Sequence, residues 1–250
     1  MKNKYLLFTG IIYIVLTGGC HYNQYSYINH LPHDPAFEKG GELTGSISTG
    51  IYGSNVQAAV SPVKHFGITG GYLRDFGAGY GYNYGALLYT PVIKKDNSGM
   101  YFSFHAERAH GLLTEKLTAT FTSINLRPSV YGCFTSDKDI LRTGLTAQFT
   151  DARYQRLFVD RTVESVFNPG TTSTEVLSDA RNVNFTGSGM YGFIEYQHKG
   201  SGIGAAFYIG SMPHRYNFWH TGDQPVQDKT FKFSQTFFFM WSLKYRLQLY

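Results

Sequence analysis

Three polar residues near the middle of the chain have the types that nucleophilic hydrolysis requires. Ser103, His105 and Glu107 alternate with Phe102 and Phe104, and a period of two places them on one face of a β-strand. A serine nucleophile needs a histidine base within hydrogen-bond reach, and the base needs a carboxylate to orient it. Neighbours on one strand face are about 7 Å apart at Cα, so such contacts would require converging rotamers. We therefore interpret the three residues as a polar ladder on the inner face of a strand and predict no catalytic site.

The other residue whose type predicts chemistry is Cys20. Two lysines within the first four residues precede an apolar run, 5–16, that is too short to span a bilayer as a helix. Two glycines stand directly before the cysteine. This arrangement resembles a bacterial lipoprotein signal, so 1–19 is predicted to be removed and Cys20 to be acylated. An ordinary secretory signal that ends nearby is the alternative. With Cys20 acylated, Cys133 is the one remaining cysteine, and no disulfide forms within the chain.

The element type that positions these residues is clearest in the C-terminal stretch Phe231–Tyr250. Its odd positions are almost all aromatic or aliphatic, and its even positions include lysine, arginine, serine and threonine. A period of two over about twenty residues predicts a long β-strand, whereas strands of soluble sheets usually have about 5–6 residues. A strand that crosses a bilayer needs about 9–11 residues, and the sequence contains no amphipathic helix to cover the apolar face. We therefore expect lipid to cover it.

The composition agrees with this class of protein. The 250 residues suit a single domain, and 16% of them are charged, compared with about 25% in soluble domains. The mean hydropathy of −0.23 is too polar for a helical membrane protein, but a transmembrane barrel alternates apolar and polar residues and gives such a value. The net charge of +5 is modest, and no basic run is spaced for base stacking, so no nucleic-acid partner is predicted.

The alternating segments predict an all-β fold, an antiparallel up-and-down transmembrane β-barrel of about ten strands (8–12). The predicted strands are 43–51, 56–62, 66–72, 80–88, 100–106, 117–134, 141–149, 190–197, 203–209 and 231–250. The two longest connections, 153–189 and 213–228, would be loops at the same end of the barrel. Five aromatic residues in these loops are predicted to bind a partner: Tyr154, Phe167, Tyr216, Phe218 and Trp219. Packing of the five over the barrel mouth is the alternative.

Several motifs resemble those of a family of small outer-membrane β-barrel lipoproteins from two-membrane bacteria. They are the leader that ends at Cys20, the run Phe37-Glu38-Lys39-Gly40-Gly41-Glu42-Leu43, the run Val56-Gln57-Ala58-Ala59-Val60-Ser61-Pro62, and Arg127-Pro128-Ser129. The resemblance covers nearly the whole mature chain and implies no catalytic residue. The chain then divides into a signal peptide, 1–19, a periplasmic tether, 20–40, and a β-barrel domain, 41–250.

Together these patterns predict an outer-membrane lipoprotein with a structural or partner-binding role. Its partners would be outer-membrane lipid and, through the external loops, another envelope protein; no cofactor or metal ion is predicted. Because no acidic stretch follows Cys20, the resemblance implies a lipid in the periplasmic leaflet, and we expect both chain termini to be periplasmic. Three alternatives stay open: a soluble periplasmic barrel or sandwich on a lipid tether, a small pore, and an outer-membrane lipid hydrolase.

Overall fold

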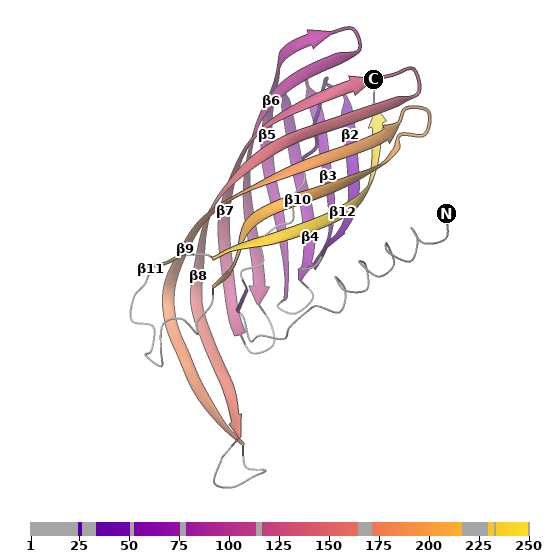
Figure 1. The fold of residues 1–250 in the computed structure, drawn as a ribbon. Helices are drawn as coiled ribbons and strands as arrows, with labels where there is room; N and C mark the ends of the chain where they lie inside the picture. The colour runs from indigo at the N-terminus through magenta and orange to yellow at the C-terminus, as the bar shows by residue number, and fades with distance from the viewer. Residues whose placement is uncertain are drawn as a thin grey trace, which may run out of the picture.

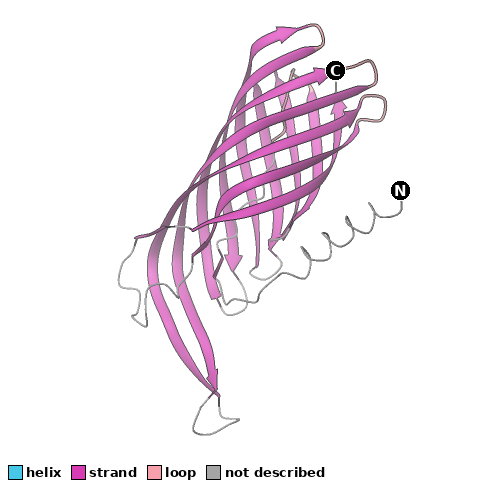
Figure 2. Cartoon of the chain, in the orientation of Figure 1, coloured by secondary structure: helices cyan, strands magenta, loops and turns pink. Residues whose placement is uncertain are grey.

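The regular elements of the protein are β-strands throughout the part of the chain that the structure describes. The computed structural model describes residues 25–26, 34–50, 53–75, 79–113, 117–164, 172–216, 230–232 and 234–249. Figures 1 and 2 show the strands wound into one tilted barrel. Within these ranges there is no helix long and apolar enough to cross a bilayer, a finding that does not bear on crossing by strands.

Ten strands form a closed antiparallel barrel. They are β2 (Glu42–Gly50), β3 (Gly53–Val63), β4 (Phe66–Asp75), β5 (Gly79–Lys95), β6 (Ser98–Leu113), β7 (Leu117–Thr135), β8 (Asp139–Glu164), β9 (Thr172–His198), β10 (Ile203–Tyr216) and β12 (Ser234–Gln248). The barrel closes because β12 pairs with both β10 and β2. Two short strands lie outside this cycle: β1 (Tyr25–Ser26) pairs with β10, and β11 (Thr230–Lys232) runs parallel to β9. The predicted ten-stranded barrel is confirmed.

The two ends of the barrel differ in how the strands are connected. At one end, which we call the short-turn end, the connections are 64–65, 96–97, 136–138 and 199–202, and the last residues of β12 lie there too (Figure 1, top). The opposite end, which we call the loop end, carries the connections between β2 and β3, β4 and β5, β6 and β7, β8 and β9, and β10 and β12. The hairpin of β8 and β9 extends well beyond the other strands at this end (Figure 1).

The prediction of a long irregular loop at 153–189 is wrong. β8 continues to Glu164, β9 begins at Thr172, and the two strands pair along this whole length. The sequence here is rich in β-branched and aromatic residues, which favour strands. It lacks a strict alternation, however, and alternation arises when one face of a strand is buried. The second predicted loop, 213–228, begins with the end of β10, and the rest of it lies outside the described residues.

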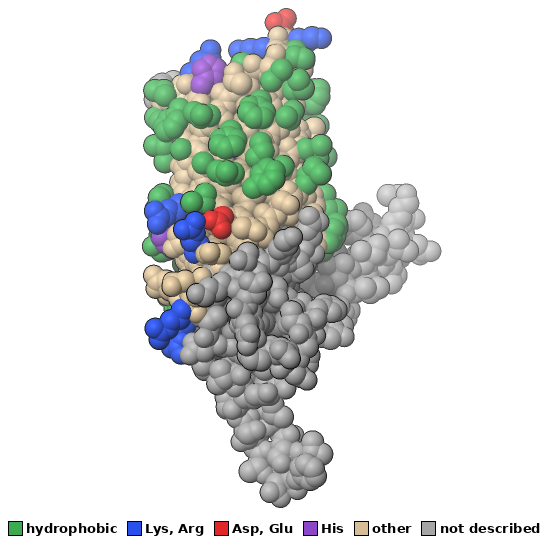
Figure 3. Space-filling model, turned by 90° about the vertical axis from the view of Figure 1, so that its left-hand side faces the viewer, with side chains coloured by type: hydrophobic (Ala, Val, Ile, Leu, Met, Phe, Trp, Pro, Cys, Tyr) green, Lys and Arg blue, Asp and Glu red, His purple; other side chains and the backbone are tan. Residues whose placement is uncertain are grey.

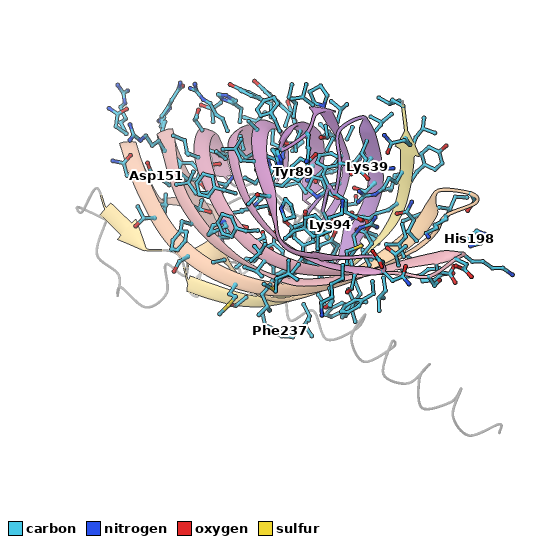
Figure 4. All side chains as sticks on the ribbon, turned by 90° about the horizontal axis from the view of Figure 1, so that it is seen from above. Lys39, Tyr89, Lys94, Asp151, His198 and Phe237 are labelled. Atoms are coloured by element: carbon cyan, nitrogen blue, oxygen red, sulfur yellow. The ribbon has the colours of Figure 1, made fainter. Side chains whose placement is uncertain are left out.

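Side chains alternate between the outside and the lumen along every barrel strand whose side chains are described. In β12, Trp241 and Leu243 are exposed, whereas Met240, Ser242 and Lys244 are buried. Figure 4, which looks down on the barrel, has Phe237 on the outer side of the wall and Tyr89 on the inner side. The two faces predicted for the closing strand are therefore confirmed.

Candidate functional site: a filled lumen and its surroundings

The interior of the barrel contains part of the chain that precedes the first barrel strand. Residues 34–41, which we call the lumen segment, lead into β2. Asp34, Ala36 and Phe37 are buried, and Phe37 has no exposed surface at all. Of the predicted tether, 20–40, the part at 34–37 is thus buried inside the barrel. Tethers are usually recognised by their lack of periodicity, and that feature gives no indication of burial.

The backbone of the lumen segment is held by side chains of the strands. Lys244 Nζ donates to the carbonyl of Asp34 at 3.0 Å, and Arg246 donates to the carbonyls of Pro35 and Ala36. The Tyr131 hydroxyl donates to the carbonyl of Phe37 at 2.6 Å. An irregular buried segment must have its polar backbone groups paired, and these donors satisfy that requirement.

Two acidic side chains of the lumen segment are also bound. The Asp34 carboxylate accepts hydrogen bonds from Ser129 at 3.2 Å and from Thr146 at 2.8 Å. Glu38 Oε1 accepts from Arg142 Nε at 2.9 Å and from Arg142 Nη2 at 2.6 Å. Both carboxylates of the lumen segment are therefore paired with donors from the barrel wall.

Glu195 is the centre of a buried charge cluster beside the lumen segment. Its carboxylate accepts from Arg142 Nη1 at 2.8 Å, from Arg246 Nη2 at 3.4 Å, and from Lys244 Nζ. These residues come from β8, β9 and β12, and all four side chains are at least nine-tenths buried. We call Glu195, Arg142, Lys244 and Arg246 the lumen cluster. It joins β8, β9 and β12 to the lumen segment, because Arg142 also binds Glu38, and Lys244 and Arg246 also bind its carbonyls.

A second buried cluster contains Ser103, His105 and Glu107, whose residue types are those that a serine hydrolase requires. Glu107 accepts a bidentate pair of bonds from Arg127, both at 3.3 Å, and a further bond from Asn125 at 3.1 Å. His105 Nε2 lies 2.8 Å from Thr69 Oγ1. Ser103, His105 and Glu107 are buried in the lumen, as the outward positions of Phe102 and Phe104 predicted. The partner of His105 comes from β4, and the partners of Glu107 named here come from β7.

Apolar and aromatic side chains fill much of the remaining lumen. Phe37 contacts the ring of Tyr89, with centroids 5.9 Å apart, in a buried group with Ala59 and Leu87. The strand beneath Phe37 has a glycine, Gly67, where a Cβ atom would lie 2.8 Å from Phe37 Cε2. A larger residue at position 67 would therefore displace Phe37. Further rings line the barrel wall in contact with one another: Tyr101, Tyr131, Phe193, Tyr208, Tyr191 and Phe238.

The predicted loop aromatics are placed differently from one another. Tyr154 lies in β8, is 3% exposed, and contacts Phe121 and Phe185 at centroid distances of 5.7 and 4.9 Å. It is therefore part of the interior and not of an external loop. Tyr216 is the last residue of β10. The other three aromatics, Phe167, Phe218 and Trp219, lie outside the described residues, as does Cys20. Cys133 is buried in β7.

The outer surface of the barrel is a hydrophobic band between two charged rims. Figure 3 shows hydrophobic side chains over the middle of the barrel and charged side chains above and below them. Exposed lysines lie near the short-turn end, and exposed arginines lie toward the loop end: Lys64, Lys94, Lys95, Lys138 and Lys199; Arg74, Arg108, Arg153, Arg156 and Arg181. Within the band, the outward-facing Gly132 and Gly192 leave an apolar groove of about 700 Å³.

Comparisons with known proteins give no family. No family model and no curated protein matches the chain. Among solved structures, the chain is similar to one described by the words "Unveiling the Mechanism Behind the in-meso Crystallization of Membrane Proteins". That similarity covers 83% of each chain at 10% identity and a TM-score of 0.29. A likeness this weak carries no argument about function, which must come from the chain's own geometry.

Proposed function

We propose that the protein is an outer-membrane β-barrel lipoprotein, acylated at Cys20, with a structural or partner-binding role and no enzymatic activity. The observation that carries the proposal is the reversal of polarity between the inside and the outside. Large apolar side chains such as Ile47 and Trp241 are 61% and 57% exposed, whereas the side chains of Arg127, Arg142, Glu107 and Glu195 are buried. Monomeric soluble proteins rarely expose apolar patches larger than a few hundred Å². In lipid, by contrast, this band is the stable surface.

The closure of the sheet supports the same environment. A bilayer core offers no water to hydrogen-bond free backbone groups, so only helices and closed barrels span it. The ten-stranded barrel leaves no open sheet edge in its wall. A soluble barrel would also be closed, but it would expose its polar side chains and bury its apolar ones. The exterior therefore favours the membrane over the soluble alternative.

The filled lumen favours a structural or binding role over conduction. The lumen segment, the lumen cluster and the aromatic side chains occupy the interior. The proposed binding surface for a partner protein is the extended β8–β9 hairpin, which projects beyond the barrel at the loop end (Figure 1). Its exposed backbone edges and its distance from the wall suit it for contact with another envelope protein.

The membrane environment can be tested by placing a charge in the hydrophobic band. Trp241→Arg should lower the free energy of unfolding in lipid vesicles by about 2–4 kcal/mol more than Trp241→Ala, because an arginine near the bilayer midplane loses its hydration. In water, a residue that is more than half exposed would accept either change with little effect. Urea titration of vesicle-folded protein, read by the gel shift between boiled and unboiled samples in SDS, measures the difference. Equal stabilities for the two variants would favour the soluble alternative. Ser242→Arg is unsuitable as a control, because Ser242 is buried against Ser48.

Acylation can be tested separately from the fold. Cells that are given radiolabelled palmitate should incorporate label into the wild-type protein and not into the Cys20→Ser variant. Cys133→Ser is the matched control and should keep the label, because Cys133 is buried in the barrel wall. Equal labelling of Cys20→Ser and wild type would contradict acylation at Cys20 and leave the barrel itself unaffected.

A further inference from the structure

The contacts of the lumen segment define the direction in which it runs through the barrel. Glu38 binds Arg142, three residues after the start of β8, and Asp34 binds Thr146, four residues farther along the same strand. Four residues of a strand correspond to about 13 Å. Because β8 starts at the short-turn end, the chain comes closer to the loop end as it is followed back from Gly41 to Asp34.

A second, independent observation gives the same direction. In β1, Tyr25 pairs with Tyr216 and Ser26 pairs with Arg215. These partners are the last residues of β10 at the loop end, whereas β10 begins at Ile203 at the short-turn end. The chain is therefore at the loop end at Tyr25 and at the short-turn end at Glu42. The other described terminus, near Gln248, is also at the short-turn end, where it pairs with Glu42.

We propose that the N-terminal chain enters the barrel through the loop-end mouth, so that the acyl group on Cys20 is anchored in the leaflet at the loop end. This inference rests on the proposed function for the membrane and for the lipid. Cys20 is five residues from Tyr25, which limits its distance from the end of β10 to about 18 Å.

The length of the chain between Cys20 and Tyr25 determines which leaflet an acyl group on Cys20 can reach. Ile209, an outward apolar residue of β10, is seven residues before Tyr216. Seven residues extend about 23 Å along the strand, or about 18 Å along the axis of a barrel with a strand tilt of about 40°. Cys20 can thus reach the nearer edge of the hydrophobic band. The farther edge lies about another 25 Å away, beyond the reach of the linker.

In a two-membrane bacterium, short turns face the periplasm and long loops face the exterior. The lipid would then lie in the outer leaflet, on the same face as the loops. The absence of an acidic stretch after Cys20 had implied the periplasmic leaflet. The geometry favours the other leaflet, because the barrel itself carries the chain across the membrane.

Three epitope tags test the inference in otherwise full-length protein. One tag stands between Asn23 and Gln24, one after Gly170 in the β8–β9 connection, and one after Tyr250. On intact cells, antibody should bind the first two tags, and it should bind the third only after the outer membrane is permeabilised. If the tag near Asn23 needs permeabilisation while the tag after Gly170 is labelled on intact cells, the inference is wrong. If all three tags are labelled only after permeabilisation, the proposed outer-membrane barrel fails instead.

A crosslink tests the same path without an inserted tag. In a Cys133→Ala background, Ser26→Cys with Arg215→Cys joins two paired positions and should form a disulfide upon mild oxidation. Ser26→Cys with Ile203→Cys, at the opposite end of β10, should not. The gel shift on boiling reports that each double variant has folded. Crosslinking of the Ile203 pair and not of the Arg215 pair would overturn the inference.

Discussion

Replacing Glu195 with glutamine should lower the free energy of unfolding of the barrel by about 3–5 kcal/mol, the range for breaking a buried ion pair. Glu195 is the shared acceptor of Arg142, Lys244 and Arg246. Without its charge, three buried cations lose a common partner while they remain shielded from water. Denaturant titration in vesicles, followed by tryptophan fluorescence and by the gel shift on boiling, measures the loss.

Two further variants separate this effect from a general loss of polar contacts. Asp139→Asn alters an exposed carboxylate that accepts bonds from Tyr196 and His198, and such solvent-exposed pairs contribute little to stability. Glu195→Gln combined with Lys244→Met should be less destabilised than the sum of the two single changes, since one of the three cations that lose their partner is gone. A loss at Glu195 as small as that at Asp139 would show that the lumen cluster does not hold the barrel together.

Removing the lumen segment should turn a barrel that does not conduct ions into one that does. A chain that begins at Glu42, refolded into planar bilayers, should give single-channel currents that the full-length protein lacks. The described lumen would then have four cations, Arg127, Arg142, Lys244 and Arg246, and three carboxylates, Glu42, Glu107 and Glu195, because Asp34 and Glu38 leave with the segment. The excess of positive charge predicts a preference for anions, which the reversal potential in a salt gradient would reveal.

The charge argument has its own control. Adding Lys244→Gln to the shortened chain should reduce or abolish the anion preference and keep the conductance. Phe37→Ala in the full-length chain should not produce conductance, because the backbone of the lumen segment is held by Lys244, Arg246 and Tyr131. Currents of equal size from the full-length and shortened proteins would contradict a plugging role for the segment.

The sequence contains enough information to predict the barrel wall. Alternation in the closing strand sets which side chains face outward, and Phe102 and Phe104 correctly place Ser103, His105 and Glu107 in the lumen. These predictions succeed because the two faces of each wall strand meet different environments, and the period of two records that difference.

The interior arrangement leaves a much weaker trace in the sequence. The lumen segment is held largely through its carbonyl groups, which every residue has, so its composition does not reveal it. Inward positions for Glu195, Lys244 and Arg246 follow from alternation, but their pairing joins residues 49 and 51 positions apart. The extension of β8 and β9 likewise depends on the pairing of two distant segments. The sequence places Tyr154 in a loop because this pairing is not visible in the residues around it.

The lumen segment also constrains the order in which the protein can be assembled. Lys244 and Arg246 belong to the last barrel strand, yet they bind carbonyls 210 or 211 positions earlier in the chain. Contacts of such sequence separation form late and slowly. Once β12 has paired with β2, the N-terminal chain would have to be threaded through a crowded, charged interior. The wall is therefore expected to close around a lumen segment already in place, so that this segment and the final strand meet late in folding.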